Sequence, residues 1–225
     1  MAFIELEGLD GAGKSTQVAL LTECLRARGI QYEYLHFPRF DAPFYGELIA
    51  RFLRGEYGDA AQVDPYLVAL LYAGDRNDAK ALINGWLAEG KFVILDRYVY
   101  SNIAFQCAKL EGEARKKLMQ WILDLEFGYN ALPRPDVALF LDVPFAFTER
   151  KLTQTRKGDD RAYLNGGSDV HEQSLDLQRR VREVYMELDA AQADFRMVDC
   201  SSPAGEMLPP EDIFARVMDN IGKLL

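Results

Sequence analysis

Residues 7–16, which read EGLDGAGKST, constrain the fold more than any other stretch of this 225-residue chain. They fit the pattern G-x-x-x-x-G-K-[ST], in which glycines allow backbone N–H groups to point inward around a phosphate chain. Residues 3–6 before the motif are apolar and β-prone, and Val18, Leu20, Leu21 and Leu25 after it fall on one side of a helix. A strand, a glycine-rich loop and a helix in this order indicate a phosphate-binding loop (P-loop), with a chance glycine-rich turn as the alternative.

The residue types of the P-loop predict its chemistry. The Lys14 side chain can reach the β- and γ-phosphates of a nucleotide, and the Ser15 hydroxyl can bind Mg²⁺. The N-terminus of the following helix adds positive potential. We therefore expect a catalytic role for Lys14. The expected phosphate-binding residues are Gly8, Gly11, Ala12, Gly13, Lys14, Ser15 and Thr16.

The composition limits the classes of protein to which the chain can belong. With 49% hydrophobic residues, the chain can form one large domain, residues 1–225, or one domain with an inserted lid. Its net charge of -9 argues against a nucleic-acid polymer as partner, whereas a nucleotide needs only a local basic pocket. No apolar run is long enough to span a bilayer, and Glu5 and Glu7 interrupt the apolar N-terminal stretch, so no membrane partner and no signal peptide are expected. Three cysteines and two histidines without metal-ligand spacing argue against zinc and favour a cytoplasmic protein with reduced thiols.

Short apolar runs alternate with helical patterns along the chain. Among the expected helices are residues 101–109, with side chains pointing inward or outward by turns, residues 114–127 and residues 213–224. The expected strands are residues 3–6, 32–36, 92–95, 137–141 and 195–199. This alternation predicts an α/β domain of three layers with about five strands. Between the last two strands, a polar segment at about residues 152–168 contains Arg156 and Arg161. It could be a lid that closes over phosphates or, equally, a solvated loop.

Other candidate residues follow the second and third strands or lie on a long helix. Arg39 follows the second strand and could contact a phosphate, with a surface arginine as the alternative. Asp96 and Arg97 lie at the end of a buried strand. In a P-loop protein an acid at this place is expected to belong to the Mg²⁺ site, and the arginine beside it can hold a phosphate. A structural salt bridge is the alternative. Tyr72 and Arg76 share one helix face, and their spacing alone favours a core tyrosine and a solvated arginine.

Together these motifs resemble those of thymidylate kinases, and the likeness runs nearly end to end. It rests on residues 8–15, Phe37-Pro38-Arg39, Asp75-Arg76, Asp96-Arg97-Tyr98 followed by Ser101-Asn102, and residues 132–136 (LPRPD). The P-loop is generic, but its combination with the Asp-Arg-Tyr and Phe-Pro-Arg segments is specific. The resemblance implies a P-loop NTPase fold with a five-stranded parallel sheet flanked by helices, usually as a homodimer. It also implies transfer of the γ-phosphoryl group from ATP to dTMP with Mg²⁺.

The resemblance also implies roles for individual residues in binding dTMP. Asp10 would approach the 3′-hydroxyl of the sugar and the metal, joining Ser15 and Asp96 at the Mg²⁺ site. Arg39 and Arg97 would hold the acceptor phosphate, and Asp10 and Arg97 would also take part in catalysis. The other implied dTMP-binding residues are Phe37, Tyr72, Arg76, Asn102, Phe105, Asp169 and Glu172.

Within this set the implied roles differ. Tyr72 would stack on thymine, where the family usually has phenylalanine, and Phe105 would crowd the 2′ position of the sugar. Arg76 and Asn102 would bond the polar edge of the base. Asp169 and Glu172 resemble acids that follow the lid and come near the acceptor and metal. For both acids, a capping role at a helix N-terminus is a sufficient alternative.

One departure concerns the catalytic arginine. One branch of the family carries this arginine in the P-loop, where this chain has Gly11, and the other branch supplies it from the lid. The basic lid segment fits the second arrangement, with Arg156 and Arg161 as the candidates. Two alternative functions remain open. A deoxynucleoside kinase would use Asp96 as a base, and a P-loop regulator would bind nucleotide without small-molecule turnover.

Overall fold

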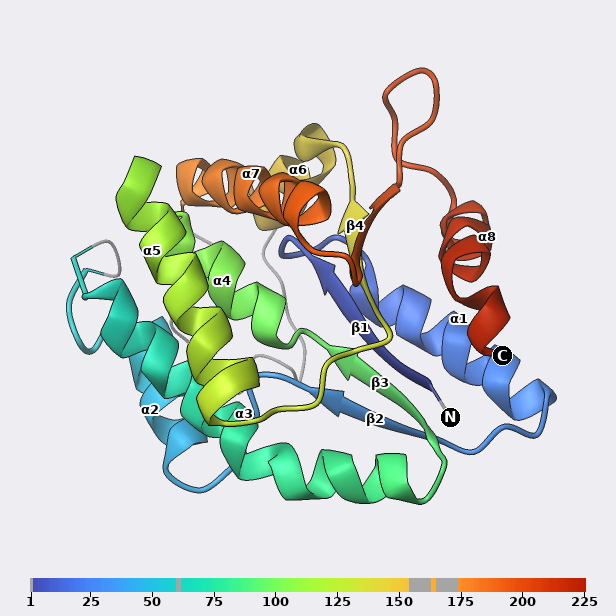
Figure 1. Ribbon diagram of the computed structural model, residues 1–225. Coiled ribbons are helices and arrows are strands. Elements are labelled where there is room, and N and C mark those ends of the chain that lie inside the picture. The colour runs from blue at the N-terminus through green and yellow to red at the C-terminus, as the bar shows by residue number, and fades with distance from the viewer. Residues whose placement is uncertain (1, 60–61, 154–162, 165–173) are drawn as a thin grey trace.

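Five parallel strands form the central sheet in the computed structural model, which describes residues 2–59, 62–153, 163–164 and 174–225 (Figure 1). The spatial order of the strands is β2-β3-β1-β4-β5. The strands are β1 (Ala2–Gly8), β2 (Tyr32–His36), β3 (Phe92–Asp96), β4 (Val137–Asp142) and β5 (Phe195–Asp199). The predicted strands and the α/β class are confirmed.

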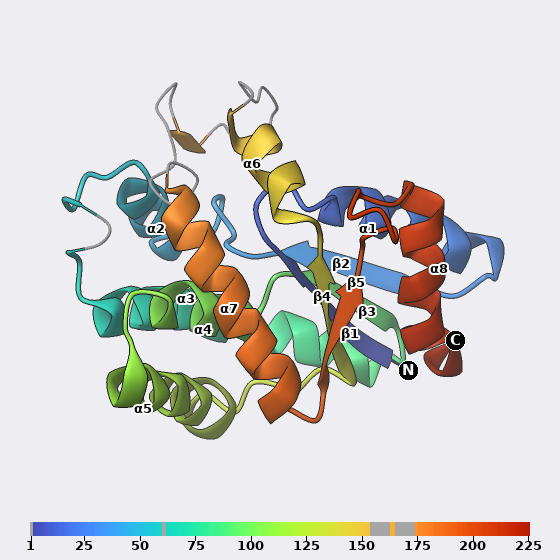
Figure 2. The same cartoon turned by 90° about the horizontal axis from the view of Figure 1, so that it is seen from above.

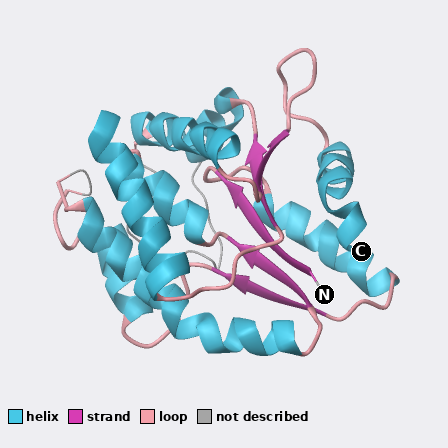
Figure 3. Cartoon of the chain, in the orientation of Figure 1, coloured by secondary structure: helices cyan, strands magenta, loops and turns pink. Residues whose placement is uncertain are grey.

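Helices pack against both faces of the sheet and make the outer two layers (Figures 1 and 2). Those of the described residues are α1 (Lys14–Ala27), α2 (Tyr45–Leu53), α3 (Pro65–Ala88), α4 (Val99–Cys107), α5 (Gly112–Leu123), α6 (Phe145–Thr153), α7 (Leu175–Ala191) and α8 (Pro210–Ile221). Helices α1 and α8 cover one face, whereas α3, α4, α5 and α7 lie on the other. Figure 3 shows this separation of the magenta strands from the surrounding helices.

The alternation of side chains along β1 divides the core into two parts. Ile4 and Leu6 belong to the apolar cluster under α1 and α8, and Phe3 belongs to the cluster on the opposite face. Because successive side chains of a strand point to opposite faces, Glu5 and Glu7 share the side of Phe3 and are buried there. Two acids thus face the helices α4 and α7.

Several element boundaries differ from the predicted ones. The helix expected at residues 101–109 begins at Val99 and ends at Cys107, and all nine of its residues are buried instead of alternating between inside and outside. The helix expected at 114–127 ends at Leu123 and continues as a π-helical segment, η1 (Asp124–Tyr129). The last helix starts three residues earlier than expected, at Pro210, because proline suits a first turn. A 3₁₀ turn, η3 (Gly222–Leu224), follows it.

The strand register brings the P-loop and Asp96 to the same edge of the sheet. Leu6 of β1 lies beside Asp96 of β3, and Gly8 lies beside Leu141 of β4. Ligands of such sheets bind at the carboxyl ends of the strands. The expected lid lies largely outside the described residues. No described helix combines the length and apolar character needed to cross a membrane.

Candidate active site

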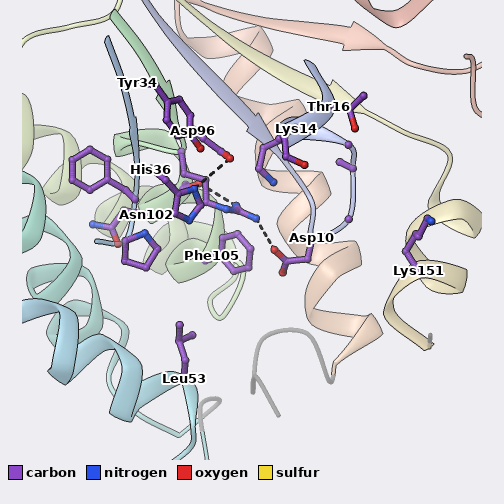
Figure 4. Close-up of a pocket in the computed structure, with 18 of the residues that line it drawn as sticks. Asp10, Lys14, Thr16, Tyr34, His36, Leu53, Asp96, Asn102, Phe105 and Lys151 are labelled. Carbon is purple, nitrogen blue, oxygen red and sulfur yellow. Dashed lines mark hydrogen bonds and ion pairs between the residues drawn. The ribbon is translucent and has the colours of Figure 1, made fainter. Parts of the chain in front are cut away.

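A cavity of about 1080 Å³ opens at the carboxyl ends of the strands. Residues of the P-loop, of the ends of β2 and β3, and of α3, α4 and α6 line it. Figure 4 shows Lys14 and Asp10 at the P-loop, with Asn102 and Lys151 on opposite sides of the cavity. The volume of the cavity is slightly above the usual range for small-molecule sites, about 300–1000 Å³, so that the cavity can accommodate more than one nucleotide-sized ligand.

The P-loop has the backbone that its sequence predicts. Gly11 and Gly13 have φ angles of 80° and 85°, a positive-φ backbone conformation that residues with a side chain rarely adopt. Helix α1 begins at Lys14, so its N-terminus faces the cavity. The Lys14 Nζ donates to the carbonyl oxygens of Gly8 and Leu9 at 3.3 Å each. Burial and then the nearby Arg97 lower the pKa of this amine.

Arg97 and Asp10 form an ion pair beside the P-loop. The Arg97 Nη2 lies 2.6 Å from Asp10 Oδ1, and Nη1 donates to Ser101 Oγ at 3.2 Å. The other Asp10 oxygen accepts from Gln178 Nε2 of α7 at 2.9 Å. Burial opposes the charge of Arg97, but Asp10, together with Tyr185, Glu7 and Asp96, outweighs it and raises the pKa of the arginine. A permanently charged guanidinium therefore lines the cavity, about 5.2 Å from the centre of the Phe105 ring.

Asp96 is an ionised carboxylate at the end of β3. Its Oδ2 lies 3.3 Å from His36 Nδ1. Burial raises the pKa of Asp96, but His36, Lys14 and Arg97 together lower it to about 2. Its Oδ1 is buried and has no hydrogen-bond partner among the described residues. A negatively charged oxygen that faces the P-loop lysine is thus available to a cation or to water bound to a cation.

The opposite end of the cavity carries an aromatic and polar surface from α3 and α4. Tyr72, Arg76, Asn102 and Phe105 all line it. Arg76 is only 2% exposed, so the prediction of a solvated arginine, which spacing alone favoured, is wrong. The reason is an acid distant in sequence, Glu126 of η1, which pairs with the guanidinium and neutralises its charge in the core. This end can therefore hold a flat ring by stacking and by hydrogen bonds.

A family model described as thymidylate kinase matches residues 6–208. The chain belongs to the thymidylate kinase family. A thymidylate kinase from Mycobacterium tuberculosis is 38% identical over 188 residues, which are 83% of this chain and 85% of that protein. A probable thymidylate kinase from Pyrobaculum aerophilum is 31% identical and covers 100% of this chain and 98% of its own. The solved thymidylate kinase of Candida albicans superposes with a TM-score of 0.72 at 25% identity, over 99% of this chain and 91% of that one.

Most residues expected from the likeness to thymidylate kinases gather at this cavity. They are Asp10, Gly11, Ala12, Gly13, Lys14, Ser15, Thr16, Phe37, Tyr72, Arg76, Asp96, Arg97, Asn102 and Phe105. Gly8 lies just outside, where a β-carbon would be 3.1 Å from that of Ala12. Arg156, Arg161, Asp169 and Glu172 lie outside the described residues. Their roles, like those of the gathered residues, stay predictions.

Arg39 is not among the described residues that line the cavity. Its Nε and backbone N–H donate to the carboxylate of Asp75, each at 2.9 Å. Its Nη2 donates to Asp78 Oδ2 at 2.6 Å and to the Asp75 carbonyl oxygen at 2.9 Å. These contacts fasten the loop after β2 to α3. The phosphate contact of Arg39 stays a prediction.

Sequence reasoning missed Glu7, a buried acid that supports the candidate active site. Glu7 accepts hydrogen bonds from the backbone N–H of Tyr98 at 3.1 Å and of Ser101 at 2.9 Å. The hydroxyls of Ser101 and Tyr185 donate to its other oxygen at 2.5 and 2.6 Å. Glu7 thereby fixes the turn that carries Arg97. Two acids spaced two residues apart in an apolar strand were the available signal.

Proposed function

We propose that this chain transfers the γ-phosphoryl group of ATP to the phosphate of dTMP, giving dTDP and ADP. The observation that carries the proposal is a single cavity with a P-loop at one end and a buried arginine–amide pair, Arg76 and Asn102, at the other. Between them lies the charged guanidinium of Arg97. A donor triphosphate, an acceptor phosphate and a pyrimidine base would each meet a suitable group in this order.

The proposed reaction needs alignment and charge neutralisation more than acid–base chemistry. The acceptor is itself a phosphate with a second pKa near 6, so it is already largely an anionic nucleophile at neutral pH. Phosphoryl transfer passes through a loose transition state, in which positioning and positive charge supply most of the catalysis. Lys14 would contact the donor phosphates and Arg97 the acceptor phosphate. Asp96 is a poor general base, because its pKa is lowered to about 2.

The donor set suits Mg²⁺, which accepts one or two carboxylates and otherwise keeps water and substrate phosphates. The Oδ1 of Asp96, which has no partner among the described residues, and the cavity-lining residue Ser15 would supply oxygen ligands, and Asp10 would lie near the acceptor side. Bound Mg²⁺ would neutralise charge on the β- and γ-phosphates. The likeness to thymidylate kinases supports this assignment, and it also leads us to propose a cytoplasmic homodimer.

The base would be recognised by the polar groups of Arg76 and Asn102. Thymine presents a carbonyl oxygen, O4, beside an N3–H donor. The guanidinium can donate to O4, and the Asn102 Oδ1 is a buried acceptor with no partner among the described residues. We assign Tyr72 to stacking on the ring and Phe105 to the 2′ position of the sugar. Cytosine, with an amino group and an unprotonated N3, would leave these groups unpaired.

The transferring phosphoryl group also needs a cation that the P-loop does not supply, because Gly11 has no side chain. We propose that Arg156 or Arg161 supplies it, as their place in the sequence after α6 suggests. We likewise propose that Asp169 and Glu172 come near the acceptor and the metal.

A panel of acceptors assayed with ATP and Mg²⁺ tests the proposed function. Each group left unpaired costs about 1–3 kcal/mol, so kcat/KM should be roughly 10-fold or more higher for dTMP than for dCMP. Purine monophosphates should also be poor acceptors, and thymidine should be inert. Equal kcat/KM for dTMP and dCMP would overturn the base assignment. Preferential phosphorylation of thymidine would indicate a deoxynucleoside kinase, and ADP release that needs no acceptor would indicate a regulator.

A further inference from the structure

A fully buried acid in the π-helical segment η1 holds both polar groups of the base end of the cavity. Glu126 is 0% exposed. Its Oε2 lies 2.5 Å from Arg76 Nε, and its Oε1 accepts from Arg76 Nη2 at 2.7 Å. The same Oε1 accepts from Asn102 Nδ2 at 2.8 Å. One carboxylate thus connects α3, α4 and η1.

This arrangement dictates which way the Asn102 amide faces. The Nδ2 group has two hydrogens, and both are used, one by the Ala69 carbonyl oxygen at 3.0 Å and one by Glu126. Both partners are pure acceptors, so a turned amide would place its oxygen against two other oxygens. The Oδ1 is therefore held on the remaining side, where it has no partner among the described residues. Asn102 lines the cavity as an acceptor.

Glu126 orients the Arg76 guanidinium in the same way. The bidentate contact uses Nε and Nη2, which leaves Nη1 as the remaining nitrogen of the fork. Arg76 also lines the cavity. An arginine that is 2% exposed needs an anion close by. Burial opposes its charge, but the charge and hydrogen bonds of Glu126, together with Asp75 and Tyr98, outweigh burial and raise the pKa of the arginine. The carboxylate thus keeps the donor of the site charged and fixed.

We propose that Glu126 is a positioning residue that sets the base specificity of this site. It presents an acceptor on Asn102 next to a donor on Arg76, which is the complement of the N3–H and O4 of thymine or uracil. Cytosine reverses both groups. It could be accepted only if the amide turned over, and Glu126 together with the Ala69 carbonyl oxygen prevents that turn. This inference rests on the proposed function, since it assigns the origin of the preference for dTMP.

The local backbone supports a functional role for this position. Helix α5 ends at Leu123, and the chain then widens into the π-helical turns of η1 before the loop to β4. Short π-helical turns are rare and occur frequently at functional sites. Glu126 is the buried residue of this segment, whereas its neighbours are at least partly exposed.

The test compares Glu126→Gln with the wild-type chain, using dTMP and dCMP as acceptors. The substitution keeps the size of the side chain but removes the anion, and its amide can donate to a turned Asn102. We expect the ratio of kcat/KM for dTMP over dCMP to fall at least tenfold, mainly through a higher KM for dTMP. Asp194→Asn is the matched control. Its carboxylate accepts from the Tyr100 hydroxyl at 2.6 Å, next to the N-terminus of β5, and this substitution should leave the ratio unchanged.

A structural role alone would lower both kcat/KM values by the same factor, and that result would overturn the proposal. If Glu126→Gln does not fold, Glu126→Asp answers the same question, because the shorter side chain keeps the charge and draws it away from Asn102. We expect its ratio to fall at least threefold, and an unchanged ratio in this folded variant would equally overturn the proposal. A wild-type chain without preference for dTMP over dCMP would instead refute the base assignment made under the proposed function, on which this inference rests.

Discussion

The paired acids of β1 allow a quantitative test of how burial controls ionisation beneath the site. Glu5 is 0% exposed, and the backbone N–H of Tyr100 donates to its Oε1 at 3.3 Å. Its Oε2 has no hydrogen-bond partner among the described residues. Burial, followed by repulsion from the neighbouring Glu7, raises the pKa of Glu5 well above its usual value of 4.5. The folded chain therefore retains a proton on Glu5 at pH values where the unfolded chain has released it.

The retained proton makes stability depend on pH with a definite sign. The contribution of Glu5 is complete below about pH 4.5 and declines as the pH rises toward the folded-state pKa, because the unfolded chain binds fewer protons. The free energy of unfolding then falls by about 1.4 kcal/mol per pH unit for one proton. In Glu5→Gln a neutral amide of the same shape replaces the protonated acid, so this decline disappears. The free energy of unfolding of the variant minus that of the wild type should therefore increase with pH, by up to about 1.4 kcal/mol per pH unit.

Urea denaturation of both chains at pH 5, 6 and 7 measures this difference, and contributions from other groups cancel in it. Glu23→Gln on the exposed face of α1 is the control and should give a difference that does not change with pH. If the difference for Glu5→Gln were equally flat, Glu5 would ionise in the folded chain as it does in the unfolded one. The burial argument for this carboxyl would then be refuted.

Four further predictions concern the site and the packing of α3. Lys14→Ala should abolish phosphoryl transfer, because the partner of the lysine is ligand phosphate, while circular dichroism and the Tm stay close to those of the wild type. At least one of Arg156→Ala and Arg161→Ala should lower kcat roughly a hundredfold or more with KM nearly unchanged, and we expect the larger effect from Arg156→Ala. A near-normal kcat in the double variant would place the catalytic arginine elsewhere. Gly74→Ala should destabilise the chain by about 1–3 kcal/mol, because the new methyl group would overlap the ring of an α2 tyrosine, as thermal unfolding can show. Gly85→Ala on the same helix, where a β-carbon meets nothing within 4 Å, should instead stabilise it by about 0.5–1 kcal/mol.

The local pattern of the sequence was sufficient for the sheet and for the P-loop end of the cavity. Strands that are buried on both faces read as continuous apolar runs, and a glycine-rich loop before a helix follows from neighbouring residues alone. Because the carboxyl ends of parallel strands lie at one edge of a sheet, the sequence by itself places Asp96 and Arg97 beside Lys14. Each of these inferences needs only residues that are close in sequence or a general rule of α/β sheets.

Only the tertiary structure showed that Arg76, at the end of the cavity that we assign to the base, is buried, and which residues contact the buried acids. Spacing on α3 favoured a solvated Arg76, because its partner Glu126 lies 50 residues away in a segment whose π-helical form the helical pattern did not predict. Similarly, Glu7 interrupts an apolar run in the sequence, whereas in the fold Tyr185, 178 residues away, packs against it and donates to it. Whether a charged side chain is buried depends on a counter-charge or donors brought by other elements. That information is absent from local periodicity, because it arises only when the helices pack on the sheet.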